Sequence, residues 1–416
     1  MEEKRTAYEK SVLHSQCLCA GEHEYVLKRK RVVLQSLNCL GISCSEDSVP
    51  HIALLASGGG QRAAVALVGS LHQMEKDGLL DSVLYLGGVS GSTWSMASLY
   101  SDPQWSMGMD RAVSSLTSPG VELDEALSWL GERAKEEDFS LTDIWGVLTS
   151  AGIMKQMDLR LLSDEAGRKA TNPYPIYCAI EKYFFSEGPL EATWFEMSPH
   201  EAGFTDLGLF IETSLLGSKF ENGELQEEIA EMDMVKLQGV CSHGEVFLAV
   251  HWLIGLLVNV AFPSFLGDKR DIDLIIAPEF TAGNMFENLT LARDYAAKLK
   301  KPFPEIDEKI LEERDWPKDC YVFEGKEKEP TIVFMPLFNR NNCKDAEEVK
   351  AKMAEFSTFQ HSYSQEKVEL LLETGKENMK RNKQTLLREI KKAAGRRRCR
   401  KSARQRFSES CLFGLV

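Results

Sequence analysis

The chain has 416 residues, 43% of them hydrophobic and 27% charged, and its formal net charge at pH 7 is −14. This composition is ordinary for a soluble globular protein and excludes a fibrous repeat or a chain that is disordered throughout. The negative charge also argues against nucleic acid as a general partner, because a duplex is bound by clustered cations.

The ten cysteines are scattered along the chain. No CxxC pair and no His/Cys cluster indicates a metal site, so we predict no metal ion and no cofactor. Reduced thiols are expected for a protein of the cytosol. The N-terminal residues MEEKRTAYEK lack the apolar core of a secretory signal, which supports a cytoplasmic location.

Residues 1–50 are predicted to form a helical approach segment, and regular alternation of strand and helix begins after them. Residues 51–56 (HIALLA) are a short continuous apolar run that predicts a buried strand, and the glycines that follow Ser57 predict a tight turn. A helix comes next, and Gly78 is placed to end it. Its predicted apolar face consists of residues at helical spacing: Ala64, Leu67, Val68, Leu71 and Met74.

Residues 83–89 (VLYLGGV) predict a second buried strand, and residues 92–100 continue as a helix. Because right-handed crossovers lay parallel strands side by side, the turns after the two strands are expected at the same edge of one sheet. Ser90 lies in the second turn, within the string GVSGS. Small residues there permit the sharp backbone that exposes a nucleophilic hydroxyl, although a plain glycine-serine turn has the same composition.

The first turn, SGGGQR, meets another requirement of acyl transfer, because its backbone amides can approach a developing oxyanion without a side chain in the way. Arg62, just beyond the glycines, is placed either to bind a phosphate or to brace the turn. A phosphate-binding glycine loop and a plain structural turn are the alternatives. A P-loop is disfavoured because no Lys-Ser/Thr pair follows the glycines.

Residues 246–262 (VFLAVHWLIGLLVNVAF) are apolar enough to raise the question of a membrane span. The run is at the short limit of about 17 residues and contains His251 and Asn259, so we interpret it as a buried core segment. Residues 273–276 (DLII) predict another buried strand, which ends in Ala277-Pro278-Glu279.

The chain after Ser364 is predicted to be helical and charged, and it runs into a basic tail, residues 391–416. Several cations close together favour an anionic membrane surface by about 1 kcal/mol each, and a solvated or nuclear-import-like tail is the alternative.

A serine nucleophile needs a base, and histidine is the usual one. None of the eight histidines lies at a predicted strand-end turn beside an acid. A serine-carboxylate dyad is the other solution.

The strings ASGGGQR and LGGVSGSTWSMASLYS resemble the Gly-rich loop and the nucleophile elbow of the cytosolic phospholipase A2 family. The similarity covers most of the chain from Ile52 to about Glu373. Further family-like segments occur in the same order: FSLTDIWG at Phe139, NPYPIY at Asn172, WFEMSPHEAG at Trp194, LLGSKFENG at Leu215, PFPEID at Pro302, CYVF at Cys320 and FSTF at Phe356.

The resemblance implies a three-layer α/β/α, patatin-like catalytic domain over residues 51–390, with cap elements within about residues 105–250. In this family a Ser-Asp dyad cleaves the acyl ester of a glycerophospholipid through an acyl-enzyme. The stretch between Phe220 and Val246 looks much shorter than in relatives, which implies a shortened cap or lid.

Carried over position by position, the resemblance makes Ser90 the nucleophile, Gly59 and Gly60 the oxyanion hole, and Arg62 the residue that binds the substrate phosphate. Where the family has its dyad aspartate in a string like SFDFSA, this chain has APEFTA, with Glu279. The extra methylene adds about 1.5 Å of reach. Because a misplacement of about 1 Å can cost on the order of a hundredfold in rate, we expect activity to be reduced.

The resemblance is strongest to the gamma type of the family, which lacks a calcium-dependent lipid-binding domain. No room for such a domain exists upstream of Ile52. We therefore expect calcium-independent hydrolysis of fatty acyl esters of glycerophospholipids or lysophospholipids. The gamma type is prenylated, but this chain ends in CLFGLV and has no prenylation box, so the basic tail is the expected membrane contact.

The expected partners are lipid substrate and a phospholipid membrane surface, with the protein cytoplasmic and peripherally membrane-associated. The main alternative is a catalytically weakened or inactive lipid-binding paralogue of the same fold. A nucleotide-binding module that uses the glycine loop is a further alternative.

Overall fold

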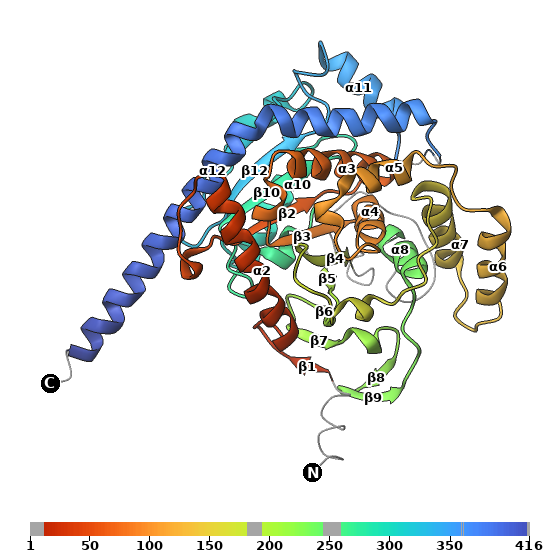
Figure 1. The fold of residues 1–416 in the computed structure, drawn as a ribbon, viewed down its shortest axis with the longest axis horizontal. Helices are drawn as coiled ribbons and strands as arrows, with labels where there is room; N and C mark the ends of the chain where they lie inside the picture. Colours follow the sequence, from red (N-terminus) through yellow and green to blue (C-terminus); the bar gives the residue numbers. More distant parts are fainter. Residues whose placement is uncertain (1–11, 181–193, 244–258, 359, 361, 414–416) are drawn as a thin grey trace.

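The computed structural model describes residues 12–180, 194–243, 259–358, 360 and 362–413 (Figure 1). Its centre is a ten-stranded mixed sheet in the order β1-β7-β6-β5-β4-β3-β2-β10-β12-β11, beside which β8 and β9 form a small antiparallel pair. The strands are β1 Leu13–His14, β2 Ile52–Ala56, β3 Tyr85–Val89, β4 Tyr174–Ile180, β5 Trp194–Met197, β6 Glu201–Phe204, β7 Leu209–Glu212, β8 Lys219–Glu221, β9 Glu224–Glu227, β10 Leu274–Glu279, β11 Tyr321–Phe323 and β12 Thr331–Pro336.

The described helices surround this sheet, and α12 crosses above α3 before it projects from the body (Figure 1). They are α2 Ala20–Cys39, α3 Gly60–Lys76, α4 Gly91–Leu99, α5 Met109–Leu116, α6 Leu123–Arg133, α7 Leu141–Val147, α8 Met234–His243, α9 Phe262–Phe265, α10 Glu287–Lys298, α11 Ala346–Glu355 and α12 Gln365–Phe413. A short π-helix, Leu148–Ile153, continues α7.

The middle of the sheet confirms the predicted strands and helices of the first half of the chain. β4, β3, β2, β10 and β12 run parallel, and β2, β3, β10 and β12 are buried throughout. Strands buried on both faces are apolar without alternation, which is why IALLA was readable as a strand. Gly78, with φ +70°, lies just after the end of α3, as predicted.

Neighbouring glycines of β3 show that helices cover both faces of the sheet. A Cβ on Gly87 would meet Phe265 of α9 at 2.7 Å, whereas a Cβ on Gly88 would meet Met96 of α4 at the same distance. Because successive side chains in a strand point to opposite faces, α9 and α4 lie on opposite sides. The predicted three-layer α/β/α class is therefore confirmed.

The outer helix α12 packs closely on α3 through two glycines. A Cβ on Gly69 would meet the carbonyl oxygen of Leu372 at 2.2 Å, and one on Gly375 would meet that of Ala66 at 2.5 Å. The two helices thus approach backbone to backbone, which fixes α12 over the helix that begins at the glycine turn.

Much of the basic segment of α12 contacts the body of the protein. Arg397 pairs with Asp271 and Asp273, and Arg400 pairs with the same two acids. These two cations are therefore paired inside the chain, and the basic tail as the membrane contact stays a prediction. The side chains beyond Ser402 lie outside the described part of the chain.

Residues 12–50 also form part of the body, and not only a helical approach to it. β1 pairs antiparallel with β7 at the edge of the sheet, which the sequence did not indicate. α2, as predicted, is helical, and its buried face includes Tyr25, Val33 and Leu37. Most of the apolar run 246–262 lies outside the described residues, but its last three, Val260 to Phe262, are buried.

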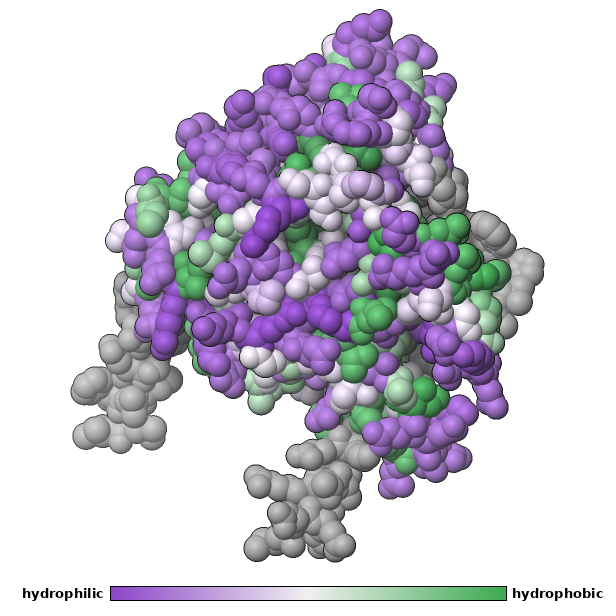
Figure 2. Space-filling view, turned by 45° about the vertical axis from the view of Figure 1, so that its right-hand side comes forward, coloured by the Kyte–Doolittle hydropathy of each residue, from purple (hydrophilic) through white to green (hydrophobic). Residues whose placement is uncertain are grey.

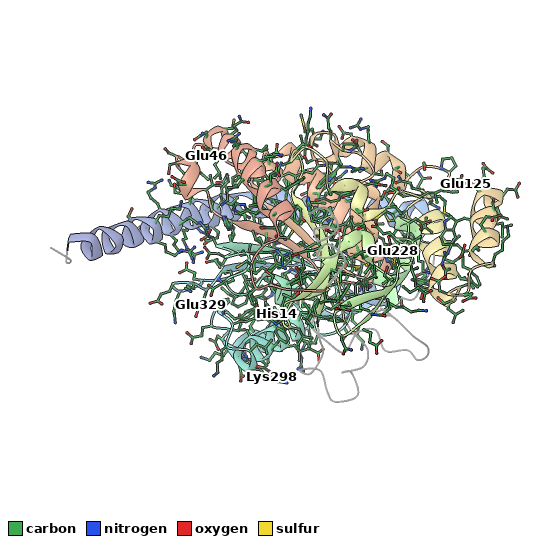
Figure 3. The ribbon with its side chains drawn as sticks, turned by 90° about the horizontal axis from the view of Figure 1, so that it is seen from below. His14, Glu46, Glu125, Glu228, Lys298 and Glu329 are labelled. Carbon is green, nitrogen blue, oxygen red and sulfur yellow. The ribbon has the colours of Figure 1, made fainter. Side chains whose placement is uncertain are left out.

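Across the described ranges, no helix is both long and apolar enough to cross a bilayer. The space-filling view in Figure 2 shows a largely hydrophilic surface with hydrophobic areas toward its right-hand side. Seen from below in Figure 3, the projecting end of α12 and Glu125 of α6 mark opposite ends of the molecule.

Candidate active site

The turns predicted to carry chemistry lie at one edge of the sheet. Ser90 directly follows β3, the glycine turn follows β2, and Glu279 is the last residue of β10. These three strands are parallel neighbours in the order β3-β2-β10. The chain proceeds from β2 to β3 on one side and from β10 to β12 on the other, so the strand order reverses between β2 and β10. Open α/β sheets bind their ligands at such a switch point.

Ser90 has a strained backbone at the start of α4. Its φ is +49° and its ψ is −129°, a conformation that costs a non-glycine residue about 1–3 kcal/mol. Two glycines make the sharp turn possible. A Cβ on Gly88 would lie 2.7 Å from the Met96 sulfur, and one on Gly91 would lie 2.0 Å from the carbonyl oxygen of Gly60. The hydroxyl of Ser90 is half-buried at the tip of this turn.

The glycine turn has a backbone that only glycine adopts readily. Gly59 has a φ of +154° and Gly60 a φ of +59°. A Cβ on Gly59 would meet the carbonyl oxygen of Phe280 at 2.7 Å, and a Cβ on Gly60 would meet that of Thr358 at 2.8 Å. Within the described chain, neither the N–H of Gly59 nor that of Gly60 donates a hydrogen bond. Both amides lie at the N-terminus of α3, where anions are favoured, and have no partner among the described residues.

Ser57 joins the three strand ends through its main chain and side chain. Its carbonyl oxygen accepts a hydrogen bond from Ser92 Oγ at 2.6 Å, and its Oγ accepts one from the N–H of Phe280 at 2.6 Å. Its own N–H donates to the carbonyl oxygen of Pro278. The nucleophile turn, the glycine turn and the end of β10 are thus held in one fixed arrangement.

Glu279 is buried, with 1% of its surface exposed. Its Oε1 accepts a hydrogen bond from the N–H of Thr281 at 2.7 Å, and its Oε2 accepts one from Asn288 Nδ2 at 2.9 Å. Burial raises the pKa of the Glu279 carboxyl above its usual range, and these hydrogen bonds partly offset that rise by favouring the charged form. Among the described residues no hydrogen bond joins Glu279 to the hydroxyl of Ser90.

Arg62 lies fully buried beneath the glycine turn. Its Nε donates to the carbonyl oxygen of Phe280 at 2.7 Å, its Nη1 to that of Phe356, and its Nη2 to Thr358 Oγ1 at 3.3 Å. The guanidinium group of Arg62, which the resemblance assigned to a substrate phosphate, thus already donates hydrogen bonds inside the protein. Of the two roles weighed from the sequence, bracing the turn fits this geometry.

Histidines do not contribute to this site in the part of the chain whose side chains are described. His72 pairs with Asp110 at the surface, His200 bonds to the hydroxyl of Tyr174, and His51 contacts Arg397. None of them bonds to Ser90. His243, His251 and His361 lie outside the described side chains. The described residues also hold no group of three or more His, Cys, Asp or Glu arranged for a metal ion.

Comparison with known proteins shows which proteins this chain is similar to. The family model described as a lysophospholipase catalytic domain matches residues 52–112 and 128–245, which include both turns. Human cytosolic phospholipase A2 gamma is 27% identical over 520 aligned positions, which cover 90% of this chain and 95% of the relative. Over most of its length the chain is thus similar to a cytosolic phospholipase A2.

Two further proteins named cytosolic phospholipases A2 match a shorter part of this chain or a smaller share of their own chain. Human cytosolic phospholipase A2 zeta is 39% identical over 240 positions, or 54% of this chain and 28% of the relative. The structure of human GIVD cytosolic phospholipase A2, in complex with methyl gamma-linolenyl fluorophosphonate, superposes with a TM-score of 0.79 and 25% identity. That match covers 94% of this chain but 66% of the solved chain.

The alignment with the human gamma relative spans 520 positions although it covers 90% of a 416-residue chain. The relative therefore has segments without a counterpart here. This chain is therefore shorter than that relative.

Three residues of the site were not found from the sequence: Ser57, Thr281 and Asn288. Ser57 opens the glycine string and was read only as part of a turn. Asn288 lies nine residues after Glu279, in the first turn of α10. The one signal in the sequence for Asn288 was a polar residue in the first turn of the helix after the candidate base. Such residues are common in helices that do not hold a catalytic group.

Proposed function

We propose that this protein hydrolyses fatty acyl esters of glycerophospholipids or lysophospholipids through an acyl-enzyme on Ser90. The observation that carries the proposal is the contact between the strained Ser90 turn and the glycine turn. A Cβ on Gly91 would lie 2.0 Å from the carbonyl oxygen of Gly60. An ester carbon beside Ser90 Oγ would therefore have the amides of Gly59 and Gly60 next to its oxygen, as an oxyanion hole requires.

Glu279 is proposed as the base. It takes the proton from the Ser90 hydroxyl as that oxygen attacks the ester carbon, and it returns the proton to the leaving alkoxide. Hydrogen bonds from Thr281, Asn288 and Ser57 hold the carboxylate in place. The raised pKa of its carboxyl suits this role, because a base works best when its pKa is near the working pH.

The comparisons support the lipid substrate. The relatives are named phospholipases A2, and the solved relative carries a fluorophosphonate with a linolenyl chain. Large apolar side chains are exposed on α6 and α7: Leu123 and Leu127, and Leu141 and Ile144. Figure 2 turns this side of the molecule toward the reader. Such a surface suits contact with lipid, and we propose peripheral association of a cytoplasmic protein with phospholipid membranes.

The proposed chemistry uses a serine, a carboxylate and backbone amides, so we also propose that hydrolysis needs no calcium ion. Equal rates with calcium and with a chelator would support this. A rate that falls to the background on chelation would contradict it.

A lipid-binding protein of the same fold without turnover is the second candidate. The observation in its favour is that the Glu279 carboxylate is hydrogen-bonded to Thr281, Asn288 and Ser57 and, among the described residues, not to Ser90. Catalytic hydrogen bonds often form only with substrate bound, so this geometry in the free protein leaves the base role of Glu279 intact.

The deciding experiment compares the parent protein with Ser90→Ala on phospholipid vesicles and with a fluorophosphonate probe. Ser98→Ala, on the same helix α4 but bonded to Gln156, is the matched control. We expect hydrolysis and labelling by the parent and the control, and neither by Ser90→Ala. A Ser90→Ala protein as active as the parent would overturn the mechanism. A parent that binds vesicles but neither hydrolyses nor labels would favour the second candidate.

A further inference from the structure

The carboxylate of Glu279 is held by an amide whose orientation is fixed from its other side. Asn288 Nδ2 donates to Glu279 Oε2 at 2.9 Å, and Asn288 Oδ1 accepts the N–H of Asn259 at 2.8 Å. A main-chain N–H can only donate, so the oxygen of the amide must face Asn259 and its nitrogen must face Glu279. Asn288 is 3% exposed, so no bulk water competes for either contact.

The same amide belongs to a connected set of polar groups. Asn288 Nδ2 also donates to Thr281 Oγ1 at 2.9 Å, and Asn259 Nδ2 donates to that oxygen at 3.1 Å. The carbonyl oxygen of Asn259 accepts the N–H of Gly58 at 3.0 Å. A Cβ on Gly58 would lie 2.3 Å from Asn259 Oδ1, so this asparagine packs directly on the glycine turn. The set therefore extends from the proposed base to the proposed oxyanion hole.

We propose that Asn288 is the positioning residue for Glu279, and that it fixes the carboxylate of this longer side chain at one place beside the glycine turn. The proposal rests on the proposed function, in which Glu279 is the base. Asn288 lies in α10, outside the turns that carry the proposed catalytic residues.

The length of the glutamate side chain makes this contact possible. Shortening residue 279 by one methylene would draw the carboxylate back by about 1.5 Å. The 2.9 Å contact with Asn288 would then exceed hydrogen-bond range. Asn288 should therefore matter to an enzyme with glutamate at position 279 and matter little to one with aspartate there.

The groups that face the carboxylate come from several elements. Thr281 donates from its own loop, Ser57 after β2 offers its hydroxyl, and Asn288 donates from α10. The positive charge of Arg62 in α3 interacts electrostatically with the carboxylate of Glu279. Against this background, replacing the donor Asn288 by a second carboxyl would leave two acids competing for one proton.

The test measures kcat/KM against pH for the parent, Asn288→Asp and Asn288→Ala. Asn288→Asp keeps an oxygen for the N–H of Asn259 and removes the Nδ2 that donates to Glu279 and to Thr281 Oγ1. Asn382→Asp is the matched control, since Asn382 Nδ2 likewise donates to a carboxylate, Asp319 Oδ2, at 3.2 Å, but on α12. We expect the acid limb of the profile to move upward by about one pH unit or more in Asn288→Asp and by less in Asn288→Ala. The control should leave the acid limb in place.

A double-mutant cycle with Glu279→Asp adds a readout that a merely structural role would not move. We expect the effect of Asn288→Ala to be at least fivefold larger with glutamate than with aspartate at position 279. Equal effects in both backgrounds, or an unchanged acid limb in Asn288→Asp, would overturn the proposal.

Failure of the proposed function can be told apart from failure of this inference. Infrared difference spectra between the parent and Glu279→Gln report the titration of the Glu279 carboxyl without any turnover. If the parent neither labels nor hydrolyses, the base role is lost and this inference falls with it as a statement about catalysis. If the parent does label, and the titration of Glu279 is not shifted in folded Asn288→Asp, the inference alone is overturned.

Discussion

The contact between Gly91 and Gly60 offers the sharpest test of the site. A Cβ added at Gly91 would lie 2.0 Å from the carbonyl oxygen of Gly60 and 2.6 Å from its carbonyl carbon. Both atoms belong to backbone and cannot rotate away. Side-chain carbons do not approach closer than 3.0 Å, so Gly91→Ala must push the two turns apart by about 1 Å.

A displacement of about 1 Å between a nucleophile and its oxyanion donors costs on the order of a hundredfold in rate. We therefore expect Gly91→Ala to lower kcat, and the rate of fluorophosphonate labelling at Ser90, by about that factor. Overpacking should also lower the free energy of unfolding by about 1–3 kcal/mol. Helix propensity acts in the opposite direction, since alanine within a helix is favoured over glycine by about 0.5–1 kcal/mol.

The control is Gly131→Ala in α6, where an added Cβ meets nothing within 4 Å. It should leave labelling unchanged and the protein as stable as the parent or slightly more so. A Gly91→Ala protein that labels within twofold of the parent would refute the reasoning that the two turns must touch.

Two further predictions concern buried charged groups. Arg62→Lys should destabilise the protein by about 1–3 kcal/mol for each acceptor that it leaves unpaired, and it should slow the labelling of Ser90. The reason is that a lysine cannot reach Phe280, Phe356 and Thr358 together. Calorimetry measures the change, and the control Arg31→Lys, at the exposed pair with Glu46, should have no effect. Burial raises the pKa of Glu165 from 4.5 to about 7, so in the folded state this carboxyl keeps its proton longer than in the unfolded chain. Its contribution to stability is therefore full below pH 4.5 and is lost as the pH rises through 7, by on the order of 3 kcal/mol. Urea unfolding of Glu165→Gln at pH 4.5 and pH 7.5 should show a smaller difference than the parent shows, and an equal difference would contradict the assignment.

The order of strands and turns around the site was predictable because its signals are local. IALLA and YLGGV are apolar runs bounded by glycine or serine turns, and β2, α3, β3 and α4 follow as expected. Parallel neighbours bring their carboxyl ends to one edge by geometry alone. That edge holds Ser90, Gly59, Gly60 and Glu279, as the sequence indicated.

Long-range pairing at the ends of the chain was not predictable. β1 is two residues long and pairs with β7, almost two hundred residues away, so no periodicity marks it. The basic residues at the end of α12 were readable as a charge cluster. Only the structure places Arg397 and Arg400 beside Asp271 and Asp273, because the partner of a charge depends on where the helix lies.

The sequence by itself determined the fold class, the resemblance to cytosolic phospholipases A2 and the turns that carry the candidate site. It could do so because a strand, a glycine turn and a strained serine turn are each specified by a few adjacent residues. The tertiary structure decided what the side chains touch: that Arg62 braces the turn, that Ser57 joins three strand ends, and that Asn288 holds Glu279. Those contacts join segments up to about three hundred residues apart, and only the packing of the sheet with its helices brings their atoms within hydrogen-bond range.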